Sequence, residues 1–513
     1  MSNEELKEKL AELDLSKDFH EMFDVEDGVK NFKFFINGEW VKGSEKDPLR
    51  SPADDSLIGY VYRATVEDVD RAVKVAKENQ YKIREIAGIE RIELMEEARH
   101  LLMEHEEDFI KVLMLEGGKT REGAKGEVES LYLRMKLTME DARKIFGEYL
   151  PGDWSKDTAQ KIALVIREPV GVVAAIGPFN YPLYIPASKI IPALLAANSV
   201  VVKPTSETPL STMMFVQILN LAGFPKGTIN LVTGPGSIVG NALASHKDVG
   251  MISFTGSTAT GRAISSVAGI KKLHLELGGK AYCIVLADAD LKSAAKKIVA
   301  GALSNAGQRC DAISAVLPVK EVADELVKLI VEEVKNWKLG NPLVDPTVKV
   351  GPVISRSAAQ RIKSLIDDAV EKGAKVLYGG KVEGTYVEPT VLYDVPETAR
   401  ILWEEIFGPV IPIHKVSNVD EALNIARRSE YGLDSCVFGN NFYELWKVAK
   451  GLQVGEVTIN DMPKHGLGYF PFGGNKNSGT GREGVGYSID EMTVLKTIVF
   501  NLEPAQMGKK VFK

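Results

Sequence analysis

Three residues in the middle of the chain have side chains that can work together in covalent catalysis. Cys310 follows Arg309 in SNAGQRCDAIS, and a cationic or dipolar setting would lower the pKa of its thiol and increase the nucleophilic thiolate fraction. Glu276 ends the apolar run LHLE, where a buried carboxylate needs a task or a partner, so it could be a general base for a thiol or for water. Asn180 follows a predicted strand in IGPFNYP, and its amide could donate to an oxyanion.

Each of these residues also has an ordinary structural interpretation. A single cysteine is often buried, a glutamate at a strand end can face solvent, and turns favour asparagine. Cys283 and Cys436 lie in the strand-like runs YCIVL and SCVFG, which indicates buried thiols. Because the three cysteines have no CxxC or CxxH spacing, we predict neither a disulfide framework nor a metal site, and a reducing cytoplasm fits best.

Two glycine-rich segments follow predicted strands. TGPGSIVG places Gly234, Gly236 and Gly240 after the run INLV, and SFTGSTATG repeats the order of strand, glycine and helix. Backbone amides at a helix N-terminus attract a pyrophosphate, which favours a dinucleotide. The spacing departs from the GxGxxG fingerprint, so a plain strand-to-helix turn remains the alternative.

The elements that must position these residues form an α/β pattern. From residue 160, the apolar runs ALVI, GVVAAIGP, SVVVKP, TINLVTG and VGMISFTG alternate with helical stretches, and a second series contains YCIVLAD, SAVLPV, KVLYGGK, CVFGN and GEVTIND. This alternation predicts two doubly wound parallel sheets with a cleft between them. Upstream, Leu6, Leu10 and Leu13 predict a polar helical extension over residues 1–30, Asn37-Gly38 predicts a hairpin within FKFFINGEWVKG, and about one hundred helix-rich residues follow.

Composition excludes several classes of function. The chain has 513 residues, of which 45% are hydrophobic and 26% charged, so we expect folded domains with sizeable cores and not a disordered protein. The formal net charge of -7 argues against non-specific binding to nucleic acid or anionic lipid. The charged N-terminus lacks the apolar core of a signal peptide, and we predict no transmembrane helix.

Six motifs together carry a resemblance to the aldehyde dehydrogenase superfamily. PFNYP, FTGS, LELGG, GQRC, EEIFGP and PFGGNKNSG stand in the family's order and at similar spacings, and the likeness extends from INGEW near residue 36 to KTIVF near residue 500. The resemblance implies that Cys310 is the nucleophile, that Asn180 and the Cys310 backbone amide form the oxyanion hole, and that Glu276 activates the water that hydrolyses a thioester. It implies that Lys189 supports this network.

The same resemblance implies a nicotinamide dinucleotide site. The implied cofactor residues are Pro178, Lys203, Thr205, Ser206, Gly236, Gly240, Thr255, Gly256, Ser257, Leu277, Glu405 and Phe407. NAD-preferring relatives commonly carry a glutamate three residues after the lysine, where this chain has Ser206 and the carboxylate is displaced to Glu207. We therefore expect NADP to be accepted, with dual use of NAD if Glu207 swings in.

A finer resemblance is to the non-phosphorylating glyceraldehyde-3-phosphate dehydrogenases, particularly archaeal ones. It rests on GQRCDAI, GEYLPGDW and INDMPKHGLGYFPFGG. It implies substrate-phosphate contacts from Tyr181 and Arg309, and it makes Arg134, Lys464 and His465 further candidates. Bacterial members carry an arginine one helical turn before Arg134, where this chain has Ser130, so Arg134 could only substitute for it or could be a surface arginine. Arg309 also precedes the nucleophile in relatives that use other aldehydes.

The expected reaction is oxidation of D-glyceraldehyde 3-phosphate to 3-phosphoglycerate. Alternatives are the same chemistry on succinic semialdehyde, lactaldehyde or plain glyceraldehyde, and a non-catalytic scaffold on this fold. The family template implies a cofactor domain formed by 31–147 and 169–278, a catalytic domain over 279–477, and an oligomerisation element formed by 148–168 and 478–513. An unpaired strand edge in that element predicts a homodimer or homotetramer.

Overall fold

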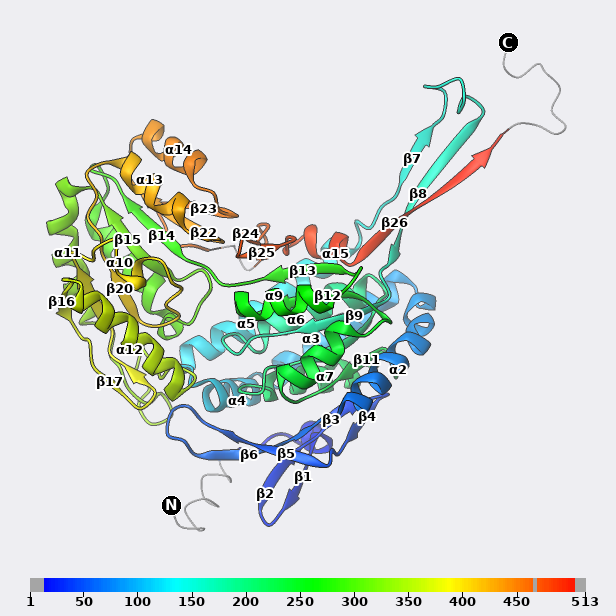
Figure 1. Cartoon of the computed structure of the whole chain (residues 1–513). Helices are drawn as coiled ribbons and strands as arrows, with labels where there is room; N and C mark the ends of the chain where they lie inside the picture. The colour runs from blue at the N-terminus through cyan, green and yellow to red at the C-terminus, as the bar shows by residue number, and fades with distance from the viewer. Residues whose placement is uncertain (1–12, 465–467, 503–513) are drawn as a thin grey trace.

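The chain folds into two α/β bodies with a long β-arm, as the computed structural model shows for residues 13–464 and 468–502 (Figure 1). The predicted α/β class is confirmed, because each body contains a parallel sheet with helices packed on it. Within the described residues, no helix is both long enough and apolar enough to cross a lipid bilayer.

The larger body contains an eight-stranded sheet whose five central strands run parallel. In sheet order, the strands are β25 (Gly479–Thr480), β13 (Lys272–Glu276), β12 (Val249–Thr255), β9 (Val172–Ile176), β10 (Ser199–Lys203), β11 (Ile229–Leu231), β3 (Phe34–Ile36) and β4 (Glu39–Val41). The two strands at the centre, β9 and β10, are short runs rich in valine and alanine that are buried on both faces, as covered parallel strands require. Their carboxyl ends carry Lys203, Thr255 and Glu276 to one edge of the sheet.

Helices cover both faces of this sheet. They are α2 (Val66–Glu85), α3 (Gly88–Glu104), α4 (Glu106–Gly117), α5 (Arg121–Ala142), α6 (Tyr184–Leu195), α7 (Leu210–Leu221), η2 (Gly236–Gly240), α8 (Asn241–Ser245) and α9 (Thr258–Val267). Several begin at side-chain caps: Thr65, Thr120 and Ser257 accept hydrogen bonds from backbone N–H groups of α2, α5 and α9. The helix-rich region predicted upstream is therefore α2 to α5.

The second body is built on a four-stranded parallel sheet, in the order β15 (Ile313–Pro318), β14 (Ala281–Val285), β22 (Asp434–Phe438) and β23 (Glu456–Ile459). Cys283 and Cys436 face each other across β14 and β22, and both are buried, as expected. The helices are α10 (Leu291–Leu303), η3 (Ser304–Gly307), α11 (Lys320–Val334), α12 (Arg356–Glu371), η4 (Arg400–Leu402), α13 (Val419–Arg428) and α14 (Phe442–Gly451). The smaller strands are β16 (Lys375–Tyr378), β17 (Val382–Glu383), β18 (Tyr386–Val387), β19 (Thr390–Tyr393), β20 (Val410–Pro412), β21 (Tyr431–Gly432) and β24 (Asn475–Lys476).

The arm is an antiparallel sheet of β7 (Glu148–Pro151), β8 (Lys161–Pro169) and β26 (Thr493–Asn501), with β8 in the middle and α15 (Tyr487–Glu491) at its base (Figure 1). The run ALVI lies in β8, so the prediction that placed it in the parallel-sheet series was wrong. An apolar run alone does not distinguish an arm strand from a core strand, and most of this arm is exposed.

The N-terminal region differs from the helix predicted over residues 1–30. Leu6 and Leu10 lie outside the described residues, and Leu13 is buried before a short helix, η1 (Lys17–Met22). The strands β1 (Phe23–Glu26) and β2 (Val29–Phe32) then form a hairpin, and β2 pairs with β6 (Leu57–Arg63), which is followed in the sheet by β5 (Glu45–Arg50). Asp27 and Gly28 have φ of 52° and 81°, which is the turn chemistry that favours a hairpin over a helix.

The second N-terminal hairpin matches its prediction. β3 and β4 pair antiparallel across Asn37 and Gly38, whose φ angles are 58° and 80°. Local turn chemistry therefore determined this element.

Candidate active site

Two cavities meet at Cys310, in the region between the two α/β bodies. The larger cavity has a volume of about 740 Å³ and the smaller about 420 Å³, and Thr255, Ile185 and Cys310 line both. The sulfur is thus accessible to one molecule in each cavity. This is the arrangement that a transfer reaction between two bound molecules requires.

The backbone before Cys310 has an uncommon left-handed conformation that fixes the residue. Asn305, Ala306 and Gly307 have φ angles of 54°, 54° and 70°. A Cβ on Gly307 would lie 2.2 Å from the Gly408 carbonyl oxygen, so only glycine lets these two loops touch. Gln308 anchors the same turn, because its Oε1 accepts a hydrogen bond from the Ile354 N–H at 2.8 Å. Such strain is typical of sites where function dictates backbone geometry.

The environment of the thiol differs from the prediction. Burial raises the pKa of Cys310 well above its ordinary value, and the carboxylates of Asp311 and Asp434 raise it further. Arg309 does not supply a free cation, because its Nε and Nη2 donate to Asp311 at 3.0 and 2.7 Å. Arg309 does favour the thiolate, but burial and the nearby carboxylates outweigh it, so the expected net lowering of the thiol pKa was wrong. The free thiol is protonated and needs a base when it reacts.

Asn180 lies beside the turn that carries the sulfur. Its Nδ2 donates to the Gln308 carbonyl at 2.9 Å, and Asn305 Nδ2 donates to the Asn180 carbonyl at 3.1 Å. A side-chain amide has two N–H groups, so one remains for an oxyanion formed at Cys310. The hydrogen bond to Gln308 also fixes the plane of the amide before substrate binds.

Glu276 is a fully buried carboxyl in the wall of the smaller cavity. Burial raises its pKa well above 4.5, and the neighbouring Glu483 raises it further, while Lys189 opposes this shift. Its Oε1 lies 3.0 Å from His274 Nε2, and burial lowers the pKa of His274 to about 4, so the ring is neutral. A carboxyl with a raised pKa can take a proton from water at a useful pH.

Lys189 lies behind this carboxyl and does not line either cavity. Its buried Nζ is 3.7 Å from Glu483 Oε2, which supplies a counter-charge. The sequence interpretation named Lys189 and missed His274 and Glu483. His274 sits two residues before Glu276 on β13, on the same side of the strand, so the strand period was a usable signal. Nothing local pointed to Glu483.

The larger cavity is lined by every residue predicted to hold the cofactor. These are Pro178, Lys203, Thr205, Ser206, Gly236, Gly240, Thr255, Gly256, Ser257, Leu277, Glu405 and Phe407. Ser257 caps the start of α9, where backbone N–H groups can attract a pyrophosphate, and a Cβ on Gly236 would meet nothing within 4 Å, so there is open space at that glycine. The donor set and the space fit a dinucleotide.

Near Lys203, the cavity wall is cationic and hydroxyl-rich. Burial lowers the pKa of Lys203 to about 8, and its Nζ donates to the Pro204 carbonyl at 3.0 Å. Ser206 Oγ donates to the Gly234 carbonyl at 3.2 Å, and Glu207 accepts a hydrogen bond from the Thr205 hydroxyl. Glu207 is the only carboxylate in residues 203–207, and it is already hydrogen-bonded to Thr205.

At the other end, Glu405 and Phe407 lie near Cys310. Glu405 Oε1 accepts the Gly279 N–H at 2.9 Å, and burial raises the pKa of this carboxyl. Phe407 makes an edge contact with Phe179, with ring centroids 5.7 Å apart. The loop that carries Glu405 and Phe407 is thus held in place by contacts with Gly279 and Phe179.

The predicted phosphate contacts are only partly brought together. Tyr181, Arg309 and Lys464 line the smaller cavity. Arg134 does not line it: the buried guanidinium donates to the Gly468 carbonyl and to Ser488 Oγ, the latter at 3.2 Å. It thus anchors a loop, and it is neither a ligand in this structure nor a surface arginine.

Ser130 and His465 are the two remaining positions that the sequence analysis named for the phosphate. Ser130 lines the cavity, but its Oγ donates to the Gly126 carbonyl at 2.5 Å. His465 lies outside the described residues. Lys464 is half-exposed and 3.7 Å from Asp461 Oδ2, so its ammonium can reach a charge at the cavity mouth.

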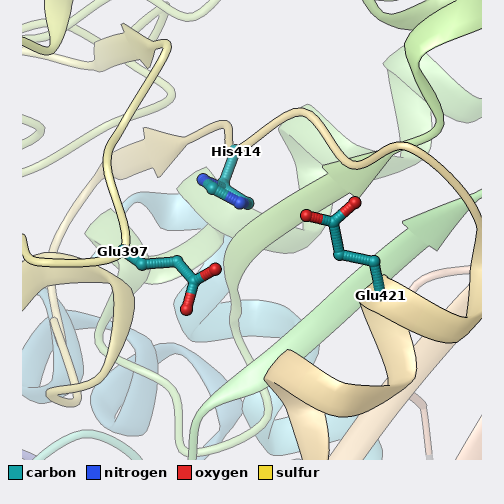
Figure 2. Close-up of side chains that lie close together, drawn as sticks. All are labelled: Glu397, His414 and Glu421. Carbon is teal, nitrogen blue, oxygen red and sulfur yellow. The ribbon is translucent and has the colours of Figure 1, made fainter.

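One group of candidate metal ligands occurs among the described residues, and none of its members lines either cavity. Glu397, His414 and Glu421 point toward one another (Figure 2). Each has another partner: Glu397 pairs with Arg428 at 2.6 Å, His414 Nδ1 is 2.7 Å from the Val395 carbonyl, and Glu421 accepts the Ser417 N–H at 2.6 Å. These contacts explain the arrangement without a metal ion.

Comparisons with known proteins agree with this geometry. Residues 40–498 match the model of the aldehyde dehydrogenase family. The chain is 40% identical to an NADP-dependent glyceraldehyde-3-phosphate dehydrogenase of Streptococcus equinus, over 92% of this chain and 99% of that protein. It is 36% identical to a lactaldehyde dehydrogenase of Methanococcus aeolicus, over 91% and 99% of the two chains.

A solved structure is equally similar. The NADP-dependent glyceraldehyde-3-phosphate dehydrogenase of Bacillus halodurans C-125, complexed with NADP, superposes with a TM-score of 0.90 at 41% identity. The alignment covers 92% of this chain and 99% of that one.

Proposed function

The chain belongs to the aldehyde dehydrogenase family, and on this premise we propose that it oxidises D-glyceraldehyde 3-phosphate to 3-phosphoglycerate with NADP, without an acyl phosphate. The observation that carries the proposal is the position of Cys310 at the junction of a dinucleotide-sized cavity and a second cavity lined by Tyr181 and Arg309. The similar proteins of Streptococcus equinus and Bacillus halodurans are NADP-dependent glyceraldehyde-3-phosphate dehydrogenases, which supports the same substrate and cofactor here.

The protein's own residues divide the reaction into two halves. As the Cys310 sulfur attacks the aldehyde carbon, the thiol proton passes to solvent water, while Asn180 and the Cys310 backbone amide stabilise the oxyanion. Glu405 and Phe407 would hold the nicotinamide end of NADP, which would accept the hydride that leaves the former aldehyde carbon as the thioester forms. In the second half, Glu276 takes a proton from water as the water attacks the thioester, which releases the acid and restores the thiol.

The preference for NADP follows from the cavity around Ser206. A 2′-phosphate would meet the Lys203 ammonium and two hydroxyl groups, and no carboxylate occupies position 206. Glu207 is bound to Thr205, which leaves the phosphate position accessible. NAD is also accepted in this proposal, because it needs only the ribose contacts.

The test of the substrate is a direct comparison of aldehydes. Steady-state NADPH formation is measured with D-glyceraldehyde 3-phosphate, glyceraldehyde, lactaldehyde and succinic semialdehyde at equal concentrations. We expect the phosphorylated aldehyde to give the highest kcat/KM. Equal kcat/KM values for glyceraldehyde 3-phosphate and glyceraldehyde would reject this substrate. The absence of NADPH formation with every aldehyde would favour a non-catalytic scaffold.

The arm supports assembly of identical subunits. β26 is an edge strand, and Leu495, Val499 and Phe500 on it are exposed. An exposed apolar edge strand is typically covered by another chain, so we propose a homodimer or homotetramer. The three free cysteines support the further proposal of a cytoplasmic location. Light scattering of the purified protein measures the assembly, and a monomer at micromolar concentration would contradict it.

A further inference from the structure

We propose that Lys119 and Glu127 form a buried positioning element that orients Tyr181 and thereby selects aldehydes with an anionic terminus. The selectivity part rests on the proposed function, because Tyr181 is there a donor to the substrate phosphate. Neither residue was identified from sequence. They lie in the connection before α5 and in its second turn, whereas Tyr181 lies just before α6.

The two side chains form an ion pair that solvent does not reach. Lys119 Nζ is 2.7 Å from Glu127 Oε2, with side-chain exposures of 3% and 0%. Two charges in the interior are costly unless their remaining polar atoms are also satisfied. Here both partners have a second contact, and both of these contacts are with the segment that follows Asn180.

Glu127 holds the start of α6. Its Oε1 accepts hydrogen bonds from the backbone N–H groups of Leu183 and Tyr184 at 3.0 and 2.9 Å. The first N–H groups of a helix have no intrahelical acceptor, so a buried carboxylate there replaces a cap. The tight turn from Asn180 to Leu183 is fixed at its far end by this carboxylate.

Lys119 lies against the face of Tyr181. Its Nζ is 3.9 Å from the ring centroid, which is within the range of a cation–π contact. The ring therefore has one face on a cation, and Tyr181 also lines the cavity that contains Cys310 and Arg309. A cation on the ring face withdraws electron density and strengthens the phenol O–H as a donor to an anion.

Among the described residues, the two other cations that line this wall, Arg309 and Lys464, each have a carboxylate partner. Arg309 donates two hydrogen bonds to Asp311, so its positive charge is already partly compensated. Within the ion pair, the Lys119 ammonium lies toward Tyr181 and the Glu127 carboxylate lies toward the backbone N–H groups at the start of α6. The pair thus favours an anion at Tyr181 without adding net charge.

The kinetic test removes the charges and keeps the hydrogen-bond acceptor. Removing one partner would leave a buried unpaired charge, so the variant is Lys119→Met with Glu127→Gln. The matched control is Lys125→Met with Glu129→Gln, an exposed lysine–glutamate pair on α5 with an N···O distance of 3.6 Å. We expect the ratio of kcat/KM for glyceraldehyde 3-phosphate to that for glyceraldehyde to fall by about 10-fold in the variant and to stay unchanged in the control. An unchanged ratio would overturn the selectivity role, even if kcat/KM fell equally for both aldehydes.

A second measurement does not depend on the substrate. In Lys119→Met with Glu127→Leu, the acceptor is also lost, so hydrogen exchange of the peptide 179–186 should accelerate by at least about 5-fold in the free enzyme. The control pair should leave this exchange rate unchanged. If wild-type enzyme showed no preference for phosphate, the proposed substrate would be wrong, and the exchange result would still decide the positioning role. Unchanged exchange would refute that role whatever the substrate.

Discussion

Replacing Glu276 by glutamine separates the two halves of the proposed reaction. Glutamine has nearly the same shape and keeps a carbonyl-type oxygen for the 3.0 Å contact with His274, but it cannot accept a proton from water. Because Glu276 is buried beside Glu483, the substitution also removes a carboxyl that is costly to ionise. The variant should therefore fold and bind cofactor normally.

The expected magnitude follows from the role of a general base. Loss of such a group slows its step by about 100-fold to 10,000-fold. Hydride transfer precedes this step, so rapid mixing should show a burst of one NADPH per active subunit, followed by a slow phase reduced by this factor. If the burst and the steady state fell together, Glu276 would act before hydride transfer, and the assignment would be refuted.

The raised pKa of Glu276 gives this variant a pH signature. In the wild type, the basic form accumulates as pH rises through the raised pKa, so deacylation should increase with pH and the variant should lose that increase. The same raised pKa makes the folded state less stable as pH rises. The folded state keeps a proton that the unfolded chain releases above its pKa of about 4.5, so this group destabilises the fold as pH rises. The Tm of the variant should therefore exceed that of the wild type at pH 8 and not at pH 4.

Substitutions at three further residues probe the cofactor, the oxyanion and the strained turn. Ser206→Glu places a carboxylate at the 2′-phosphate position, so the KM for NADP should rise at least about 10-fold while that for NAD changes little; an unchanged preference would contradict the cofactor orientation. Asn180→Ala should lower kcat by about 100-fold to 1,000-fold with normal NADP binding by fluorescence titration, and a loss below 5-fold would remove the amide from the oxyanion role. Asn305 has a φ of 54°, so Asn305→Ala should be less stable than Asn305→Gly by about 1 kcal/mol in thermal unfolding, and the reverse order would show that no backbone strain is present.

Local patterns predicted those parts of the fold that depend on neighbouring residues. The hairpin at Asn37-Gly38 follows from turn chemistry, and the parallel strands follow from short β-branched runs. Asp27-Gly28 offered the same signal as Asn37-Gly38, but the leucine spacing upstream favoured a helix. The run ALVI was misassigned because its composition suits both a core strand and the arm.

The site was predictable where a motif carried it and not where distant segments meet. Every residue predicted to hold the cofactor lines the larger cavity, because most of the motifs lie at strand ends that the sheet brings together. The sequence did not reveal that Arg309 pairs with Asp311 or that Cys310 is buried, and burial is the main cause that raises the thiol pKa. Lys119 and Glu127 matter through contacts with residues more than fifty positions away, and no local pattern reports such contacts.

The central claim is that Cys310 becomes acylated while the dinucleotide is reduced. The most direct measurement is peptide mass spectrometry of the Glu276→Gln variant, mixed with glyceraldehyde 3-phosphate and NADP and quenched in acid during the slow phase. The account predicts a thioester adduct with the mass of the phosphoglyceroyl group on the peptide that contains Cys310, at a stoichiometry equal to the NADPH burst. Formation of NADPH with an unmodified Cys310 would contradict it.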